Sequence, residues 1–510
     1  MNINTTEFGV NMRQTVFNQP VEQSIDIDFY LPDYCPDITK ILKCIFTPSI
    51  LSKSVDSNRV TIDGSVTCCV IYNDNQGHIN SCTYSFPFNK SFEMQKSAQN
   101  PSINAKIKID YMNARAVSER RIEAHGAASI LANITERNTK NVICDIDDEN
   151  VFKKCGTVNA ITPLVAADKH VIIEEEIDLG QGKPAINSII RKKACAVINE
   201  CKIISNKAVV KGDMMLKILY APSPDGRPQC FETTLPFSQV VELTGVDEDC
   251  KSDVSVDVCS LEVDTKSGLS DEVRTLSVQA KLLLGVSAYC DNDVPVVFDV
   301  FSGKYEVNQQ KEEVQFEKIV SRVNEKFICK KVLEFSDNSI GSVIDIWSDA
   351  GPSTVKCVES KVTMNGSVNI GVLGYDTEDT PVFYEKNIDY EYSFDLDTPP
   401  TKFRCIPDVK TNNISYNLLD AGRLEIRADI IMNAVIYDEI SNNVVTSVEI
   451  ETEKEKQNNS LPLILYYSTE GEEIWDIAKQ YNASPEDISK LNDISGDIIE
   501  NDKVLLIPSI

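Results

Sequence analysis

A strand-like segment with a central glycine occurs three times in the chain, and this internal repeat constrains the fold more than any other feature. The copies occupy residues 60–72, 208–220 and 361–375. Their glycines, Gly64, Gly212 and Gly366, are 148 and 154 residues apart. Apolar residues recur at every second position, which predicts a strand with one face packed inward. Each glycine lies on that inner face, which indicates a close backbone approach or a bulge.

A second segment with a period of two follows each copy after about 60 residues. Its copies occupy residues 122–134, 276–288 and 424–436. In each copy one face is apolar and the other is mixed, as in the long strands of antiparallel sheets. A further strand is expected between the two segments, marked by Phe88, Phe237 and Tyr390. Lead-in segments at 36–42, 184–190 and 341–347 favour either one helical turn or a kinked strand start.

These repeats predict a mainly β protein with three tandem antiparallel β-sandwich-like domains, each a two-layer structure that can bury its own core. A partly closed barrel remains an alternative for each unit. The expected ranges are 1–150, 165–305 and 318–450 for the β domains, 451–463 for a linker and 464–510 for a C-terminal domain. The polar stretches 150–168 and 303–318 are expected to separate the β domains, giving a string of separately folded modules.

The charge of the chain excludes some classes of partner. Lys and Arg number 50 and Asp and Glu number 78, so the net charge is −28. Neutralising phosphates requires clustered basic residues, so we expect no nucleic-acid partner and no electrostatic docking to an anionic membrane. No apolar run approaches the roughly 20 residues of a membrane span, and residues 1–14 lack the pattern of a secretory signal, so we expect a cytoplasmic location without direct membrane insertion.

No residue pattern indicates catalysis, a metal site or a cofactor. The three histidines, His78, His125 and His170, match no metal-ligand spacing. The 16 cysteines include no Cys-x-x-Cys pair, and we interpret them as small buried apolar side chains. Acidic clusters at 145–149 and 247–249 lack the spacing of a calcium loop and are interpreted as solvated surface. We therefore expect no enzyme, no catalytic residue, no metal and no cofactor.

The last 47 residues have a pattern of their own. Alternating apolar residues predict a strand at the start, two helices follow, and residues 504–508 predict a closing strand. Ser484 is expected to cap the second helix, with Pro485 at its first position. This βααβ order resembles the LysM domain, and the matching residues are Tyr467, Gly471, Ile474-Trp475, Ile477-Ala478, Tyr481, Leu491-Asn492 and 504–508.

The resemblance to LysM implies a shallow groove for N-acetylglucosamine-containing glycans between two loops. The corresponding candidates for a groove or a partner surface are Thr469, Gly471, Glu472, Glu473, Ile474, Trp475, Ile494, Ser495, Ile498 and Ile499. Two departures favour a protein partner over glycan: Glu473 replaces a small hydroxyl residue, and Asn501 replaces a glycine. Residues 464–510 contain ten acidic residues against three lysines, which gives a charge of −7. Sugar binding would have to desolvate the Glu473 carboxylate.

The three repeats, with the lead-in Pro-Asp-Ile-Thr-Lys-Ile-Leu at 36–42, resemble SPOCS domains. SPOCS repeats followed by LysM resemble a family of clostridial spore-coat morphogenetic proteins. That resemblance implies a non-enzymatic assembly protein in the mother-cell cytoplasm, at the outer forespore membrane. Its implied partners are the coat basal-layer ATPase and other coat proteins. The alternative is a LysM protein that binds peptidoglycan or another N-acetylglucosamine glycan of the wall or cortex.

Aromatic residues are the remaining candidates for an interface, because a few large side chains anchor most protein contacts. Trp347 replaces a leucine in the third lead-in and is expected to be exposed. Trp475 is expected to be half buried in the LysM core, with a partner contact as the alternative.

Overall fold

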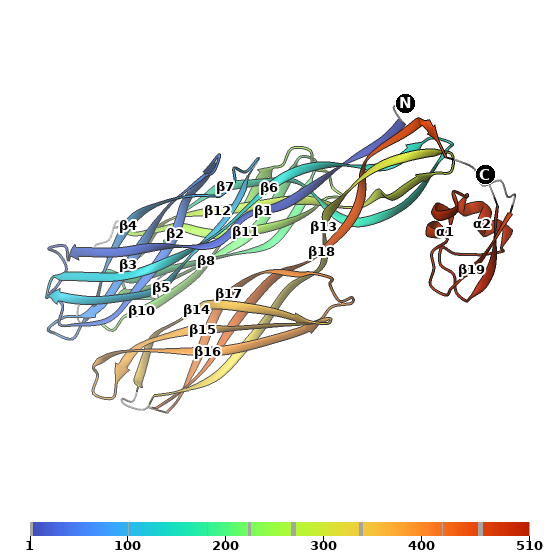
Figure 1. Ribbon diagram of the computed structural model, residues 1–510. Helices are drawn as coiled ribbons and strands as arrows, with labels where there is room; N and C mark the ends of the chain where they lie inside the picture. Colours follow the sequence, from blue (N-terminus) through green and yellow to red (C-terminus); the bar gives the residue numbers. More distant parts are fainter. Residues whose placement is uncertain are drawn as a thin grey trace.

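A computed structural model of the chain describes residues 4–99, 101–180, 182–222, 226–266, 272–335, 340–420, 422–456 and 463–508 (Figure 1). Repeat one contains β1 (Asn4–Tyr30), β2 (Lys40–Asp56), β3 (Arg59–Asn73), β4 (Ile79–Glu93), β5 (Ser102–Ser118) and β6 (Arg121–Asp147). Repeat two contains β7 (Val151–Asp178), β8 (Ser188–Ile204), β9 (Lys207–Ala221), β10 (Gln229–Glu242), β11 (Lys251–Lys266) and β12 (Thr275–Ser302). Repeat three contains β13 (Tyr305–Glu334), β14 (Ile340–Val358), β15 (Lys361–Asp376), β16 (Pro381–Asp395), β17 (Phe403–Asp420) and β18 (Arg423–Glu455).

Each repeat is a sandwich of two three-stranded antiparallel sheets. In repeat one the sheets have the orders β1-β6-β5 and β2-β3-β4, and repeats two and three use the equivalent strands in the same order. Apolar side chains between the two sheets form the core of each repeat. The C-terminal unit contains β19 (Leu463–Ser468), α1 (Ile474–Tyr481), α2 (Pro485–Leu491) and β20 (Lys503–Pro508). The predicted mainly β fold with a terminal βααβ unit is therefore confirmed.

The repeated glycines lie on the middle strand of a three-stranded sheet, where groups of the neighbouring strands approach them closely. A Cβ on Gly64 or Gly212 would come under 3.0 Å from a backbone carbonyl of the neighbouring strand and from the ring of Phe88 or Phe237. On Gly366 it would meet the Tyr390 side chain at a similar distance. Gly64 is paired with Phe88, Gly212 with Phe237 and Gly366 with Tyr390 in the strand register. The predicted close approach is thus an aromatic ring lying across a glycine in all three repeats.

The lead-ins form kinked strand starts and no helix. β2 begins at Lys40, and its pairing with β3 is irregular between Ile41 and Lys43. β8 has the equivalent irregularity between Ile189 and Arg191. In repeat one the lead-in is anchored by a hydrogen bond of 3.0 Å from the Tyr72 hydroxyl to the Pro36 carbonyl. The Tyr220 hydroxyl donates in the same way to the Pro184 carbonyl in repeat two, at 3.2 Å.

Six strands are much longer than the rest, with 27 to 33 residues each. They pair as β1 with β6, β7 with β12, and β13 with β18, and half of each pair continues beyond its third strand as a two-stranded ribbon. We call these three ribbons together the stalk, which extends from the sandwiches in Figure 1. The stalk comprises residues 4–15, 135–147, 151–163, 289–302, 305–319 and 438–455.

The stalk has a core to which all three repeats contribute. Its buried residues are Val10 and Val142 from repeat one, Val158, Ala160, Val294 and Val296 from repeat two, and Val314, Phe316 and Val444 from repeat three. Ile143, Ile146, Val297, Val300 and Val445 form a second cluster of the same mixed origin. The ribbons belong to separate sheets, so side-chain packing joins them.

The sandwiches also share a core near their lead-ins. Ile71, Ile79, Ile190, Leu219, Ala221, Trp347, Leu373 and Tyr375 form one cluster drawn from the three repeats. Arg191 of repeat two lies over the Trp347 ring of repeat three at 4.3 Å and contacts Asp345 at 3.3 Å. Trp347 is only 4% exposed, so the expectation of an exposed interface residue was wrong. This position joins the repeats to one another.

These shared cores correct the expectation of separately folded modules. The polar stretches 150–168 and 303–318 lie mostly within β7 and β13, because β7 begins three residues after the turn at 148 and β13 begins at Tyr305. Their polar side chains face solvent on one side of a ribbon. Residues 451–455 of the expected linker continue β18, and 457–462 lie outside the described residues. The limits proposed for the domains remain a prediction.

We expect Gly212→Ala to destabilise the chain by about 2 kcal/mol, because the added methyl group has no space between the Val197 carbonyl and the Phe237 ring. Urea unfolding of the full chain measures this change. Gly182→Ala is the matched control, because a Cβ at Gly182 meets nothing within 4 Å. Equal stability of the two variants would show that the aromatic–glycine contact is not a tight constraint.

Candidate functional site at the tip of the stalk

The C-terminal unit is held together by caps and by its two long loops. The Ser484 side chain accepts a hydrogen bond from the Asp487 amide at 3.2 Å, which confirms the predicted cap of α2. Asn482 ends α1 in the left-handed conformation. The first loop pairs with the second through backbone hydrogen bonds from the Gly471 amide to the Ile499 carbonyl and from the Ile499 amide to the Glu472 carbonyl, both 2.8 Å. The candidate residues of the two loops therefore lie side by side.

The ten candidate residues differ in exposure. Thr469, Gly471, Ser495 and Ile498 are exposed, Glu472, Glu473 and Ile494 are half-buried, and Ile474, Trp475 and Ile499 are buried. The Glu472 carboxylate is engaged within the unit, where it accepts hydrogen bonds from the Tyr466 hydroxyl and the Thr469 amide, both at 3.1 Å. The open part of the groove is therefore small and consists mainly of the first four residues.

The first turn of α1 contacts the tip of the stalk. The Trp475 ring packs edge-on against Phe301 of β12, with centroids 4.9 Å apart, and Phe301 in turn contacts Phe152 of β7 at 5.1 Å. Trp475 is 9% exposed and belongs to one apolar cluster with Phe301 and the core of the C-terminal unit. The expectation that Trp475 is half buried in its own domain is corrected: this contact with another part of the same chain buries it almost completely.

Asp299 of β12 is the polar centre of this contact. Its carboxylate accepts hydrogen bonds from the Trp475 indole N–H at 2.8 Å and from the Lys479 ammonium at 2.6 Å. On the stalk side, its other oxygen accepts hydrogen bonds from the Lys311 ammonium and the Gln309 amide of β13, both at 2.7 Å. Two ammonium groups and two neutral donors thus surround a side chain that is 11% exposed.

The electrostatics of Asp299 follow from these partners. Burial alone would raise the pKa of its carboxyl group, but the hydrogen bonds outweigh burial and hold the pKa far below its usual range. The donors, in order of effect, are Lys311, Lys479, Trp475 and Gln309. Asp299 is therefore ionised when the unit is docked, and its charge stabilises the docked state.

Two further contacts flank Asp299. The Glu473 carboxylate forms an ion pair with Lys154 of β7, so its charge is partly compensated within the chain. The Lys456 ammonium donates to the Asn482 side chain at 2.9 Å and to the Ser302 carbonyl at 3.0 Å. Since Glu473 and Trp475 both serve this docking contact, only part of the predicted site remains free for another ligand.

Sequence reasoning missed the stalk half of this site, which includes Lys154, Asp299 and Phe301. One signal was present, because Asp299 is the single charged residue in the otherwise apolar run 294–301. A register shift between Val297 and Asp299 lies directly before the docking residues. Such irregularities re-aim side chains, and here Asp299 and Phe301 both contact the C-terminal unit.

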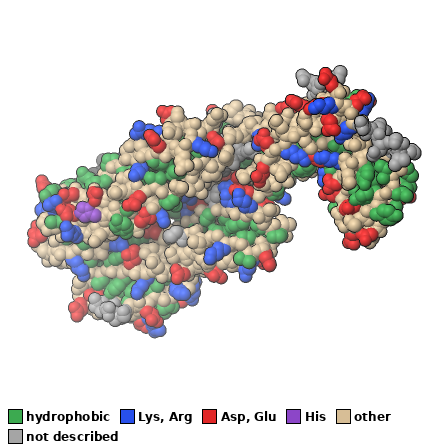
Figure 2. All heavy atoms as spheres, viewed as in Figure 1, with side chains coloured by type: hydrophobic (Ala, Val, Ile, Leu, Met, Phe, Trp, Pro, Cys, Tyr) green, Lys and Arg blue, Asp and Glu red, His purple; other side chains and the backbone are tan. Residues whose placement is uncertain are grey.

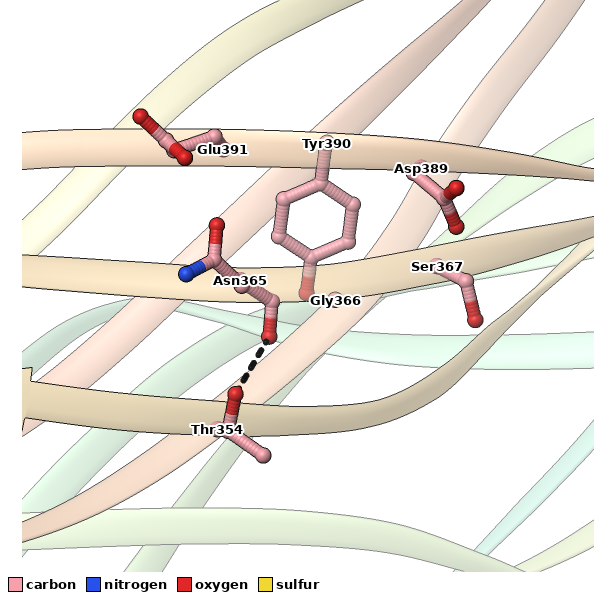
Figure 3. A pocket seen from close by; sticks show the side chains of 7 residues that line it. All are labelled: Thr354, Asn365, Gly366, Ser367, Asp389, Tyr390 and Glu391. Carbon is pink, nitrogen blue, oxygen red and sulfur yellow. Dashed lines mark hydrogen bonds between the residues drawn. The ribbon is translucent and has the colours of Figure 1, made fainter.

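A shallow hollow of about 480 Å³ lies on repeat three and is lined by Thr354, Asn365, Gly366, Ser367, Asp389, Tyr390 and Glu391. Figure 3 shows the Tyr390 ring lying across Gly366, and the Thr354 hydroxyl donating to the Asn365 carbonyl at 3.5 Å. The hollow lies at the aromatic–glycine contact found in each repeat.

Two family models match the chain. A model described as the SPOCS domain of SipL matches residues 37–117 and 185–266, which lie in repeats one and two. The LysM domain model matches residues 469–508. In these segments the chain is similar to SipL and to LysM domains. SPOCS matches followed by a C-terminal LysM match are what the sequence predicted. No curated protein and no solved structure matches the chain.

Neither helix in the described part of the chain is long and apolar enough to cross a bilayer. Among the described residues, one group of side chains has the arrangement to hold a metal ion, namely Asp247, Cys250 and Cys290 of repeat two. It lies outside the LysM domain. The roles of the ten LysM candidates as binding residues remain a prediction.

We expect Asp299→Asn to weaken docking of the LysM domain by about 2 kcal/mol, because Lys311 and Lys479 lose their shared counter-charge. Faster hydrogen exchange in residues 474–481 and a red shift of Trp475 fluorescence would report the release. Asp293→Asn, an exposed change on the same strand, is the control.

The same release should appear in the unmodified chain when Asp299 is protonated. Lys311 and Gln309 of the stalk already lower the pKa of Asp299, and docking lowers it further through Lys479 and Trp475. The stabilisation is therefore complete above the pKa of the undocked state and is lost as the pH falls through the lowered value of the docked state. Unchanged exchange in Asp299→Asn would contradict a docking role for this carboxylate.

Proposed function

We propose that this chain is a non-enzymatic assembly protein of the developing spore, which binds coat proteins and promotes encasement. The match to the SipL SPOCS domain and to LysM supports the general role. The proposed partners are the coat basal-layer ATPase and other coat proteins, and the proposed location is the mother-cell cytoplasm at the outer forespore membrane. The chain is strongly acidic, with a net charge of −28. This charge favours a protein partner over a nucleic acid or an anionic membrane.

The observation that carries a protein-binding role is an apolar surface on the LysM sheet. Leu465 is 63% exposed and Tyr467 is 77% exposed. The side chains of Leu463 and Val504 are each about half exposed. Tyr467 pairs with Val504 and Leu465 with Leu506 in the register of β19 and β20, so these residues share the outer face of one sheet. Figure 2 shows apolar side chains gathered on this unit.

Free apolar surface of this kind marks an interaction site, because each exposed aliphatic or aromatic side chain gains free energy when a partner covers it. Docking against the stalk uses α1 and leaves the outer face of the sheet uncovered. The LysM domain can therefore be held by its own chain and still present an apolar face to a second protein. Acidic residues around it, such as Asp502, favour a partner with basic residues at the rim.

We expect Leu465→Glu in the full chain to reduce capture of the coat ATPase about 30-fold or more, because it places a charge in the middle of the apolar face. Pull-down of purified proteins measures this loss. Val358→Glu is the matched control, because Val358 is 73% exposed on repeat three. Equal capture by wild type and Leu465→Glu would contradict binding through the LysM sheet.

Glycan binding is the second candidate function, favoured by the four exposed loop residues Thr469, Gly471, Ser495 and Ile498. In this alternative the chain would bind peptidoglycan or another N-acetylglucosamine glycan of the wall or cortex. Against it, Trp475 is buried on the stalk and the carboxylates of Glu472 and Glu473 are committed to other partners.

We expect no binding heat when N-acetylglucosamine oligomers at millimolar concentration are titrated into the full chain. The groove offers few free donors, and sugar hydroxyls lose their water unless donors and acceptors replace it. Isothermal calorimetry measures the heat. A saturable signal that disappears in Thr469→Ala would overturn this expectation and favour the glycan function.

A further inference from the structure

Two cysteines that are 40 residues apart in sequence meet at the base of the stalk. Cys250 directly precedes β11, and Cys290 lies on β12 next to Tyr289, which is paired with Lys251. Extending that register by one residue places Cys250 opposite Cys290. Their sulfur atoms are 2.6 Å apart, and both cysteines are free thiols in the structure. Directly opposed residues of antiparallel strands have Cα separations within the range that a disulfide spans.

The two thiols differ in burial and in their neighbours. Cys250 is 7% exposed, and its thiol contacts the Asp247 carboxylate at 3.1 Å. Burial raises the pKa of Cys250 to about 12, and its hydrogen bonds with Cys290 and Asp247 act in the same direction. Cys290 is less buried. Access therefore favours Cys290 as the thiol that meets an external reagent first, with Cys250 behind it.

We propose that Cys250 and Cys290 form an intramolecular disulfide when the chain meets a low-molecular-weight disulfide. Cys290 attacks the reagent, forms a mixed disulfide and releases one small thiol. Cys250 then loses its proton to solvent, and its sulfur attacks the Cys290 sulfur and releases the second small molecule as a thiolate, which takes up a proton from solvent. The two protein thiols are oxidised, the reagent is reduced to two thiols, and the chain loses two hydrogen atoms.

A metal ion is the competing occupant, because Asp247, Cys250 and Cys290 could each offer one ligand. Zinc bonds to thiolates are about 2.3 Å long, so tetrahedral coordination places two thiolate sulfurs roughly 3.7 Å apart. The observed 2.6 Å is well below that separation. Asp247, Cys250 and Cys290 would supply three ligands, so the fourth position of a tetrahedral zinc ion would have no protein ligand among them. The geometry therefore favours a bond between the sulfurs over a shared ion.

The position of the pair gives the bond a mechanical effect. Next to Cys290, the Tyr289 ring lies under Arg322 of β13 at 5.1 Å, and Arg322 also pairs with Asp253 of β11 at 2.5 Å. Repeats two and three thus meet directly beside the thiols. A disulfide there links the start of β11 to β12 at the junction between the sandwich and the stalk. It would therefore resist separation of β11 from β12 at this junction.

The test treats the full chain with oxidised glutathione, blocks the remaining thiols under denaturing conditions, and maps the peptides by mass spectrometry. We expect one linked peptide pair that contains Cys250 and Cys290, while the exposed Cys155 gives only a mixed disulfide. Because the Asp247 carboxylate raises the pKa of Cys250, Asp247→Asn should speed the second step, so that the glutathione adduct on Cys290 decays faster and at lower pH. Peptide mapping of the unmodified chain needs no variant that could fail to fold.

Three results would overturn the proposal. Both cysteines could remain open to alkylation after oxidation, or Cys290 could retain glutathione indefinitely. The purified chain could instead bind one zinc ion that protects both thiols, which would assign the cluster to a metal. Cys290→Ser must abolish the linked pair, and Cys195→Ser, a change at another half-buried cysteine of repeat two, must leave it intact.

Discussion

A two-stranded β-ribbon is barely stable by itself in water, and the stalk consists of three such ribbons. Each ribbon has an apolar side that no third strand covers within its own sheet. The valines of β6, β12 and β18 and their partners bury those sides against one another. Because the ribbons share no ladder of backbone hydrogen bonds, this side-chain packing is the condition for the stalk to exist. Everything at its tip, including the LysM contact, depends on it.

The same constraint explains why the repeats differ at corresponding positions. A chain in which three copies meet must provide three different surfaces at one junction, as Arg191 of repeat two and Trp347 of repeat three do. The Asp345 carboxylate between them has no exposed side-chain surface and is paired with Arg191 and Lys217. Removing Asp345 would leave the buried Arg191 without this ion pair, so we expect such a change to be destabilising.

Much of the fold was predictable because its signals are local. Alternation along 122–134 and the glycine at Gly64 both report which face of a strand is buried, and the structure agrees except at Gly126, which is half-buried, and Ala127, which is buried on the other face. The contacts between repeats were not predictable. At Trp347 and in residues 150–168 the sequence shows only how polar and how large each side chain is. Polarity and size do not tell whether a segment faces solvent or packs against another repeat. Of the candidate site, the two LysM loops followed from the motif. Asp299 and Phe301 did not, because they lie 176 and 174 residues before Trp475.

The origin of the groups around Asp299 fixes when the LysM domain can dock. The carboxylate comes from repeat two, Gln309 and Lys311 come from repeat three, and Lys479 comes from the LysM domain. β13, which supplies Gln309 and Lys311, is paired along its length with β18 of the same repeat. The receptor for the LysM domain is therefore complete only when the paired ribbons of repeats two and three are both in place.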